Sequence, residues 1–128
     1  MKFINTLLCV LLVAVLVLAP ASSARAQGKA VTMKGYVIDS ACAFIKNLKK
    51  PLSVECAIAC ARAGSPLVLL ADDGTVYWPI SDAMPATGQN DRLIKFAGQR
   101  VTASGKVYDK GGSHAIVLEQ IEGAPASK

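Results

Sequence analysis

Two segments of this chain alternate apolar and polar residues and carry a glycine near the middle of the alternation. Val31–Asp39 contains Gly35, and Arg100–Asp109 contains Gly105 in the corresponding place. A period of two predicts a half-buried β-strand. A glycine inside a strand indicates a bend, a bulge or a close approach of two backbones, which small closed barrels need where their strands turn around the axis. The two segments therefore favour a small β-barrel.

The rest of the chain supplies three more strands and two short helices. The further strand segments are Leu67–Ala71, Thr75–Ile80 and His114–Ile121. Ser53–Gly64 has a capping serine and a terminating glycine, and Asn90 predicts the start of a second helix that Gly98 ends. The fold class is mainly β. We expect a five-stranded OB-like barrel with a short cysteine-bearing helix inserted between strands 1 and 2 and a short helix between strands 3 and 4.

Residues 1–26 have the pattern of a secretory signal peptide. Lys2 is followed by an apolar stretch over Phe3–Leu18 and by the small-residue end Ala24–Ala26. Cleavage after Ala26 leaves residues 27–128, about the size of a single OB-like domain. We expect a periplasmic or secreted protein with no membrane span in the mature chain.

Removal of the signal peptide lowers the positive charge of the chain and takes away one cysteine. Without Lys2 and Arg25, 12 basic and 9 acidic side chains remain, a formal charge of +3. This charge is too small to predict nucleic-acid binding. Cys9 leaves with the signal peptide, so the mature chain keeps three cysteines, an odd number that cannot all pair with one another.

Those three cysteines are Cys42, Cys56 and Cys60. Cys56 and Cys60 are four residues apart, so a helix places them on one face. In an oxidising compartment we expect a disulfide from Cys42 to either of the other two, which closes a loop of about 15 to 19 residues and leaves one free thiol.

Two other kinds of cysteine site stay open at this point. Three thiolates suit a soft ion, Zn(II) or Cu(I), so Cys42, Cys56 and Cys60 are also candidate metal ligands for zinc or copper. His114 and Asp39 are candidate additional ligands. The third interpretation is a thiol redox protein, in which the pKa of the leftover thiol is lowered by the neighbouring basic residues Lys46, Lys49, Lys50 and Arg62. We otherwise expect no cofactor.

Aromatic and basic residues form a candidate binding surface. Tyr36, Tyr77 and Trp78 lie on predicted strands, and OB folds bind ligands across strands two and three. Tyr77 and Trp78 are adjacent and point to opposite faces, so only one of them belongs to a ligand face, and Trp78 in or against the core is the alternative. The lysines Lys46, Lys49 and Lys50 form a small basic loop.

Signatures of common enzyme classes are missing from the sequence. It has one histidine and contains no G-x-S-x-G, P-loop or G-x-G-x-x-G motif. The cysteine spacing C-x-x-x-C is not that of a thioredoxin-like motif. We therefore expect a non-enzymatic binding or interaction module of the bacterial envelope, whose partner is an envelope protein or a small ligand.

Three motifs carry a family resemblance. They are the strand end Gly35–Cys42, the spacing Cys56-x-x-x-Cys60, and the segment Phe96–Val107. Together they resemble an uncharacterised family of small exported bacterial OB-fold-like proteins. The resemblance covers most of the mature chain and implies the OB-like fold and export. It implies no established activity.

Overall fold

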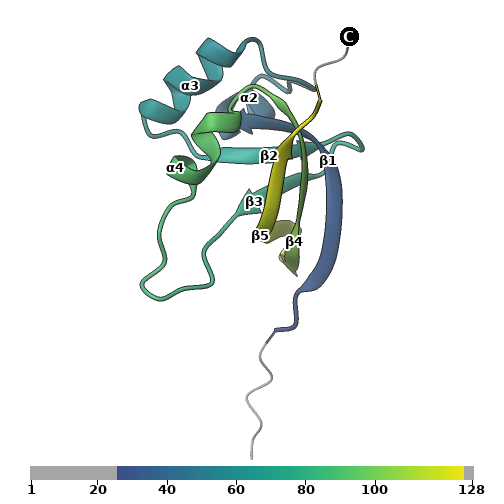
Figure 1. Ribbon diagram of the computed structural model, residues 1–128. Helices are drawn as coiled ribbons and strands as arrows, with labels where there is room; N and C mark the ends of the chain where they lie inside the picture. The colour runs from purple at the N-terminus through teal and green to yellow at the C-terminus, as the bar shows by residue number, and fades with distance from the viewer. Residues whose placement is uncertain (1–25, 126–128) are drawn as a thin grey trace, which may run out of the picture.

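The computed structural model describes residues 26–125, which form a five-stranded barrel (Figure 1). The strands are β1 (Lys29–Asp39), β2 (Leu67–Ala71), β3 (Val76–Pro79), β4 (Arg100–Lys110) and β5 (Ser113–Gly123). The barrel closes in the order β1-β2-β3-β5-β4, and β3–β5 is its only parallel pair within the described residues. The predicted OB-like barrel is confirmed. The predicted signal peptide lies outside the described residues, apart from Ala26.

Both mid-strand glycines lie where two backbones approach closely. A methyl group at Gly35 would collide with the carbonyl oxygen of Leu70, and one at Gly105 would collide with that of Val117. The pairing of β4 with β5 also shifts register between Ser104 and Gly105. The prediction that these glycines mark bends or bulges is confirmed, because no residue with a Cβ fits at either position without a local shift.

Two helices occupy the connection between β1 and β2. The predicted cysteine helix is α3 (Val54–Arg62), and Ser53 caps it by accepting a hydrogen bond from the Cys56 backbone N–H at 3.1 Å. The sequence did not predict α2 (Ser40–Phe44), a single turn that begins directly after β1. It forms because the Asp39 side chain accepts a hydrogen bond from the backbone N–H of Cys42 at 3.1 Å.

The second predicted helix is split into two pieces, α4 (Asn90–Leu93) and the 3₁₀ turn η1 (Ile94–Phe96). It lies between β3 and β4, as predicted, at the same end of the barrel as α3 (Figure 1). The prediction that Asn90 caps this helix is wrong. Gln89 is the capping residue, without a side-chain hydrogen bond. The Asn90 side chain instead accepts from Leu67 N–H at 2.9 Å and donates to the carbonyls of Ala61 and Ser65.

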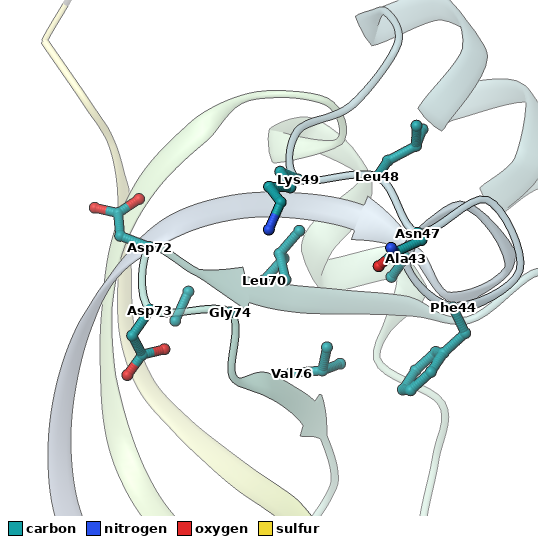
Figure 2. Close-up of a pocket in the computed structure, with 11 residues that line it drawn as sticks. Ala43, Phe44, Asn47, Leu48, Lys49, Leu70, Asp72, Asp73, Gly74 and Val76 are labelled. Carbon is teal, nitrogen blue, oxygen red and sulfur yellow. The ribbon is translucent and has the colours of Figure 1, made fainter.

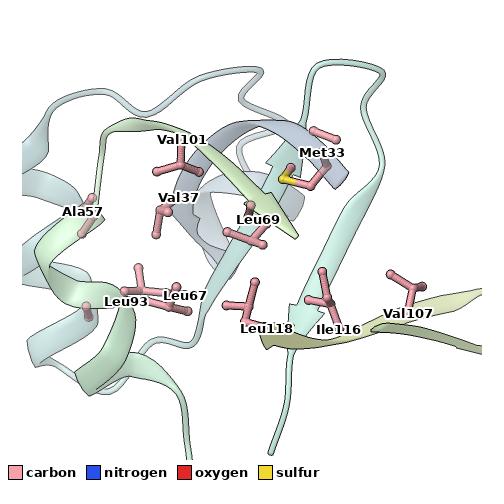
Figure 3. Close-up of a cluster of buried hydrophobic side chains, with 14 residues drawn as sticks. Met33, Val37, Ala57, Leu67, Leu69, Leu93, Val101, Val107, Ile116 and Leu118 are labelled. Atoms are coloured by element: carbon pink, nitrogen blue, oxygen red, sulfur yellow. The ribbon is translucent and has the colours of Figure 1, made fainter. Parts of the chain in front are cut away.

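Inward-pointing side chains fill the barrel (Figure 3). The labelled core includes Met33, Val37, Leu67, Leu69, Leu93, Val101, Val107, Ile116 and Leu118, with Ala57 supplied by α3. A second apolar cluster lies on the outer face of β1 and β2 and consists of Ile38, Cys42, Val68 and Leu70. Every residue of β2 is therefore buried, since the barrel interior covers one face and α2 with its following loop covers the other. Within residues 26–125, no helix has the length and apolar character needed to cross a bilayer.

Candidate functional site

A groove of about 410 Å³ lies on the outer face of β2 and β3, and we call it the β2–β3 groove (Figure 2). Residues of α2 and the loop after it form one wall of the groove, and the turn between β2 and β3 forms one end. Its lining residues are Ala43, Phe44, Asn47, Leu48, Lys49, Leu70, Ala71, Asp72, Asp73, Gly74 and Val76. This volume lies within the range of small-molecule sites.

The floor of the groove is apolar because two strands turn hydrophobic side chains outwards at the same level. Leu70 of β2 pairs with Val76 of β3, and both point away from the barrel interior. Leu48, from the loop, packs against the same outer cluster. The groove thus continues the apolar surface that α2 covers elsewhere; Leu70 is 7% exposed, so more of the open floor comes from the half-buried Val76.

The two acidic side chains of the groove have partners within the protein, whereas its lysine has no ion pair among residues 26–125. Asp72 forms a two-pronged ion pair with Arg100, with N–O distances of 2.9 and 2.5 Å, and Asp73 accepts from the Thr75 backbone N–H at 2.9 Å. The Thr75 hydrogen bond lowers the pKa of Asp73. Lys49 takes part in no ion pair among residues 26–125. Figure 2 shows its amine pointing towards Leu70, with the two carboxylates at the turn end.

Phe44 lines the far end of the groove and contacts Trp78, which lies outside the lining. The Phe44 ring stacks on Trp78, with ring centroids 5.7 Å apart and an angle of 18° between the ring planes. Phe44 is 56% exposed, whereas Trp78 packs against the outer apolar cluster. A second hollow, of about 470 Å³, begins on the other side of Phe44 and reaches Trp78 and His114.

The three predicted aromatic site residues do not form one stacking platform. Trp78 lies on the outer face of β3, and Tyr77 points inwards and packs against the barrel core. Burial, followed by the charges of Asp73 and Asp109, raises the pKa of Tyr77. The Arg100 guanidinium lies over the Tyr36 ring, and its Cζ atom is 5.4 Å from the centroid of that ring. The interpretation of Trp78 as packed against a core is the one that the structure supports, although that core is the outer cluster.

Of the three predicted lysines, only Lys49 lines the groove. Lys46 and Lys50 are exposed on the same loop, which begins after α2. The groove also contains residues that the sequence did not mark as functional, chiefly Phe44, Leu48, Leu70 and Val76. Their apolar composition is typical of a core, and only the tertiary contacts reveal that they border a hollow.

The cysteines gather around a buried carboxylate. Asp39, which was predicted as a candidate additional metal ligand, is 1% exposed and accepts from Cys42 N–H and from the Ser65 hydroxyl. A hydrogen bond between the Cys42 thiol and the Asp39 carboxylate is the main cause that raises the pKa of Cys42 to about 11, and burial adds to it. Burial, followed by the charge of Asp39, raises the pKa of Cys60. The expectation that neighbouring lysines lower a thiol pKa is therefore wrong for these two cysteines.

All three cysteines are free thiols in this structure, so the expected disulfide is not formed. Cys42 is buried, and Cys56 and Cys60 are half-buried. His114 does not join them, since it pairs with Asp109 at the β4–β5 hairpin and lies against Tyr77. Within the described part of the chain, no group of three or more Cys, His, Asp or Glu side chains is placed to hold a metal ion. The proposed zinc or copper site thus has no support in this geometry.

This chain was compared with protein families, curated proteins and solved structures. No family model, no curated protein and no solved structure matches this chain. The family resemblance of the sequence motifs remains an expectation, and the barrel rests on the structure itself.

Proposed function

We propose that this protein is an exported, non-enzymatic binding module of the bacterial envelope, with the β2–β3 groove as its ligand site. The ligand is a small amphipathic molecule. Its apolar part lies on Leu70 and Val76, and its anionic group meets Lys49. The observation that carries the proposal is Lys49, which has no ion pair among residues 26–125 and lies above an apolar floor, where both carboxylates already have internal partners.

The chemistry of the lining supports binding rather than catalysis. In the described part of the chain, the lining contains no cysteine, serine or histidine, so these residues offer no usual nucleophile and base pair. The apolar floor supplies most of the binding free energy, and the lysine selects the charge of the ligand. We also retain the prediction of one disulfide and one free thiol in the exported protein, because an oxidising compartment favours disulfides.

The binding proposal is tested with 8-anilinonaphthalene-1-sulfonate, which combines aromatic rings with one sulfonate. We expect saturable binding, seen as a rise in probe fluorescence and as quenching of Trp78, the only tryptophan of the chain. Quenching is expected because Trp78 stacks on Phe44, which lines the groove. Lys49→Met should weaken binding about three- to fivefold, the effect of losing one partly exposed ion pair.

Two controls make the test specific. Lys106→Met removes an exposed lysine of β4 that does not line the groove, and it should leave the affinity unchanged. N-phenyl-1-naphthylamine, which has the same rings without the sulfonate, should bind the wild type and Lys49→Met equally. The proposal fails if the sulfonate probe does not bind, or if Lys49→Met binds it as tightly as the wild type.

A further inference from the structure

Cys42 and Cys56 occupy the same position in two different helices. Each is the third residue after a capping side chain, Asp39 for α2 and Ser53 for α3, and each donates its backbone N–H to that cap at 3.1 Å. Capping fixes the backbone of the first helical turn. The backbone positions of Cys42 and Cys56 are therefore well defined.

The two cysteines also line one narrow crevice between α2, α3 and the end of β1. Asp39 and Ser53 line the same crevice, but Cys60, one turn further along α3, does not. A bond between Cys56 and Cys60 is disfavoured, because positions four apart on a helix hold their Cβ atoms about 5 to 6 Å apart, beyond the span of an unstrained disulfide. We propose that Cys42 and Cys56 form a disulfide, and that this bond strengthens ligand binding in the β2–β3 groove.

The link to the groove is the segment between the two cysteines. Residues 43–55 include one whole wall of the groove, namely Ala43, Phe44, Asn47, Leu48 and Lys49. Near Cys42 this segment is held by the Leu48 N–H, which donates to the Cys42 carbonyl at 3.1 Å. At its other end, α3 is anchored on the barrel by buried Ala57 and by Val54, which lies against Gly98.

A bond between Cys42 and Cys56 would therefore join α2 and α3 covalently and restrict movement of the wall that lies between them. Ordering the wall before the ligand arrives lowers the entropic cost of binding. The regulation, though not the disulfide itself, rests on the proposed function.

Bond formation needs an oxidant, for which we name a small-molecule disulfide such as oxidised glutathione. The half-buried Cys56 loses its proton, and its thiolate attacks one sulfur of the oxidant, which breaks that S–S bond and releases one glutathione thiolate. Cys42 then loses its proton and attacks the Cys56 sulfur, which releases the second glutathione. Two protein thiols are oxidised, one external disulfide is reduced, and the two protons end on the two glutathione molecules.

The first experiment identifies the bond. The full-length mature protein is incubated with oxidised glutathione, its remaining thiols are alkylated, and tryptic peptides are analysed by mass spectrometry. Trypsin leaves Cys56 and Cys60 on one peptide, so variants assign the partner of Cys42. We expect the bridge in wild type and Cys60→Ser and its loss in Cys56→Ser. A bridge retained in Cys56→Ser, or three alkylated cysteines in the wild type, would overturn the assignment.

The second experiment measures 8-anilinonaphthalene-1-sulfonate binding to the oxidised and the reduced protein. We expect oxidation to tighten binding by at least about threefold in wild type and Cys60→Ser, and to leave Cys56→Ser unchanged. Equal affinity in both redox states, with the bridge present, would overturn the regulation and leave the disulfide standing. Failure of the probe to bind in either state would instead overturn the groove as a ligand site.

Discussion

Asp39 shows how one buried carboxylate sets the properties of its neighbours. It ends β1, caps α2 and is the one buried charged residue among residues 26–125. The same oxygen that accepts from Cys42 N–H also accepts from the Ser65 hydroxyl, which ties the start of α2 to the segment before β2. A negative group at this point favours the protonated form of the nearby thiol. The buried Cys42 thiol is consequently slow to attack an external disulfide at neutral pH, and oxidation starts at the half-buried Cys56.

The raised pKa of Cys42 predicts a loss of stability at alkaline pH in the reduced protein. The folded-state pKa of about 11 lies above the usual value of 9.0. The protonated thiol therefore contributes its full stability below about pH 9, and this contribution is lost as the pH rises towards about 11. Urea unfolding across this range should show a steeper fall in the free energy of unfolding for wild type than for Cys42→Ala. Parallel curves for the two proteins would contradict the prediction.

At the scale of elements, local signals identified α3 and failed at α4. Ser53 caps α3 through an interaction within four residues, which the sequence pattern contains. Asn90 makes its three hydrogen bonds to residues more than 20 positions away, at the end of α3 and the start of β2. No local pattern distinguishes such a residue from a helix cap.

This role makes Asn90 a stability determinant. Asn90→Ala should lower the free energy of unfolding by about 2 kcal/mol, since it leaves the Leu67 N–H and two carbonyls without their partner. The neighbouring Gln89→Ala removes only exposed hydrogen bonds and should change it by less than about 0.5 kcal/mol. Urea denaturation monitored by circular dichroism measures both values. Similar losses in the two variants would show that Asn90 does not tie these elements together.

The contrast between local sequence signals and contacts with distant residues also applies to β2. The apolar run Leu67–Ala71 predicts a buried strand, and the structure confirms it. The run does not reveal what covers its outer face. That cover is α2 and the loop after it, and the β2–β3 groove lies where the cover ends.

For the molecule as a whole, export is the property that the proposed function needs most. Expressed from Met1 in a bacterium, the protein should be recovered from the periplasm or the medium with Gln27 as its first residue. Ala26→Arg should block cleavage, because the processing site requires a small residue, and should leave full-length protein at the membrane. N-terminal sequencing and cell fractionation measure both outcomes. Full-length wild-type protein in the cytosol would contradict export.

The sequence by itself determined the barrel, because alternation, turn residues and mid-strand glycines act through the backbone over a few neighbouring positions. It also determined the cysteine helix, because the Ser53 cap acts within four residues. Only the tertiary structure decided which residues form a site. The groove joins the loop after α2 to β2 and β3, and the cysteine crevice joins α2 to α3, so both depend on contacts between residues distant in the chain. Such contacts leave no local period in the sequence, because they are set by how the elements pack around the barrel.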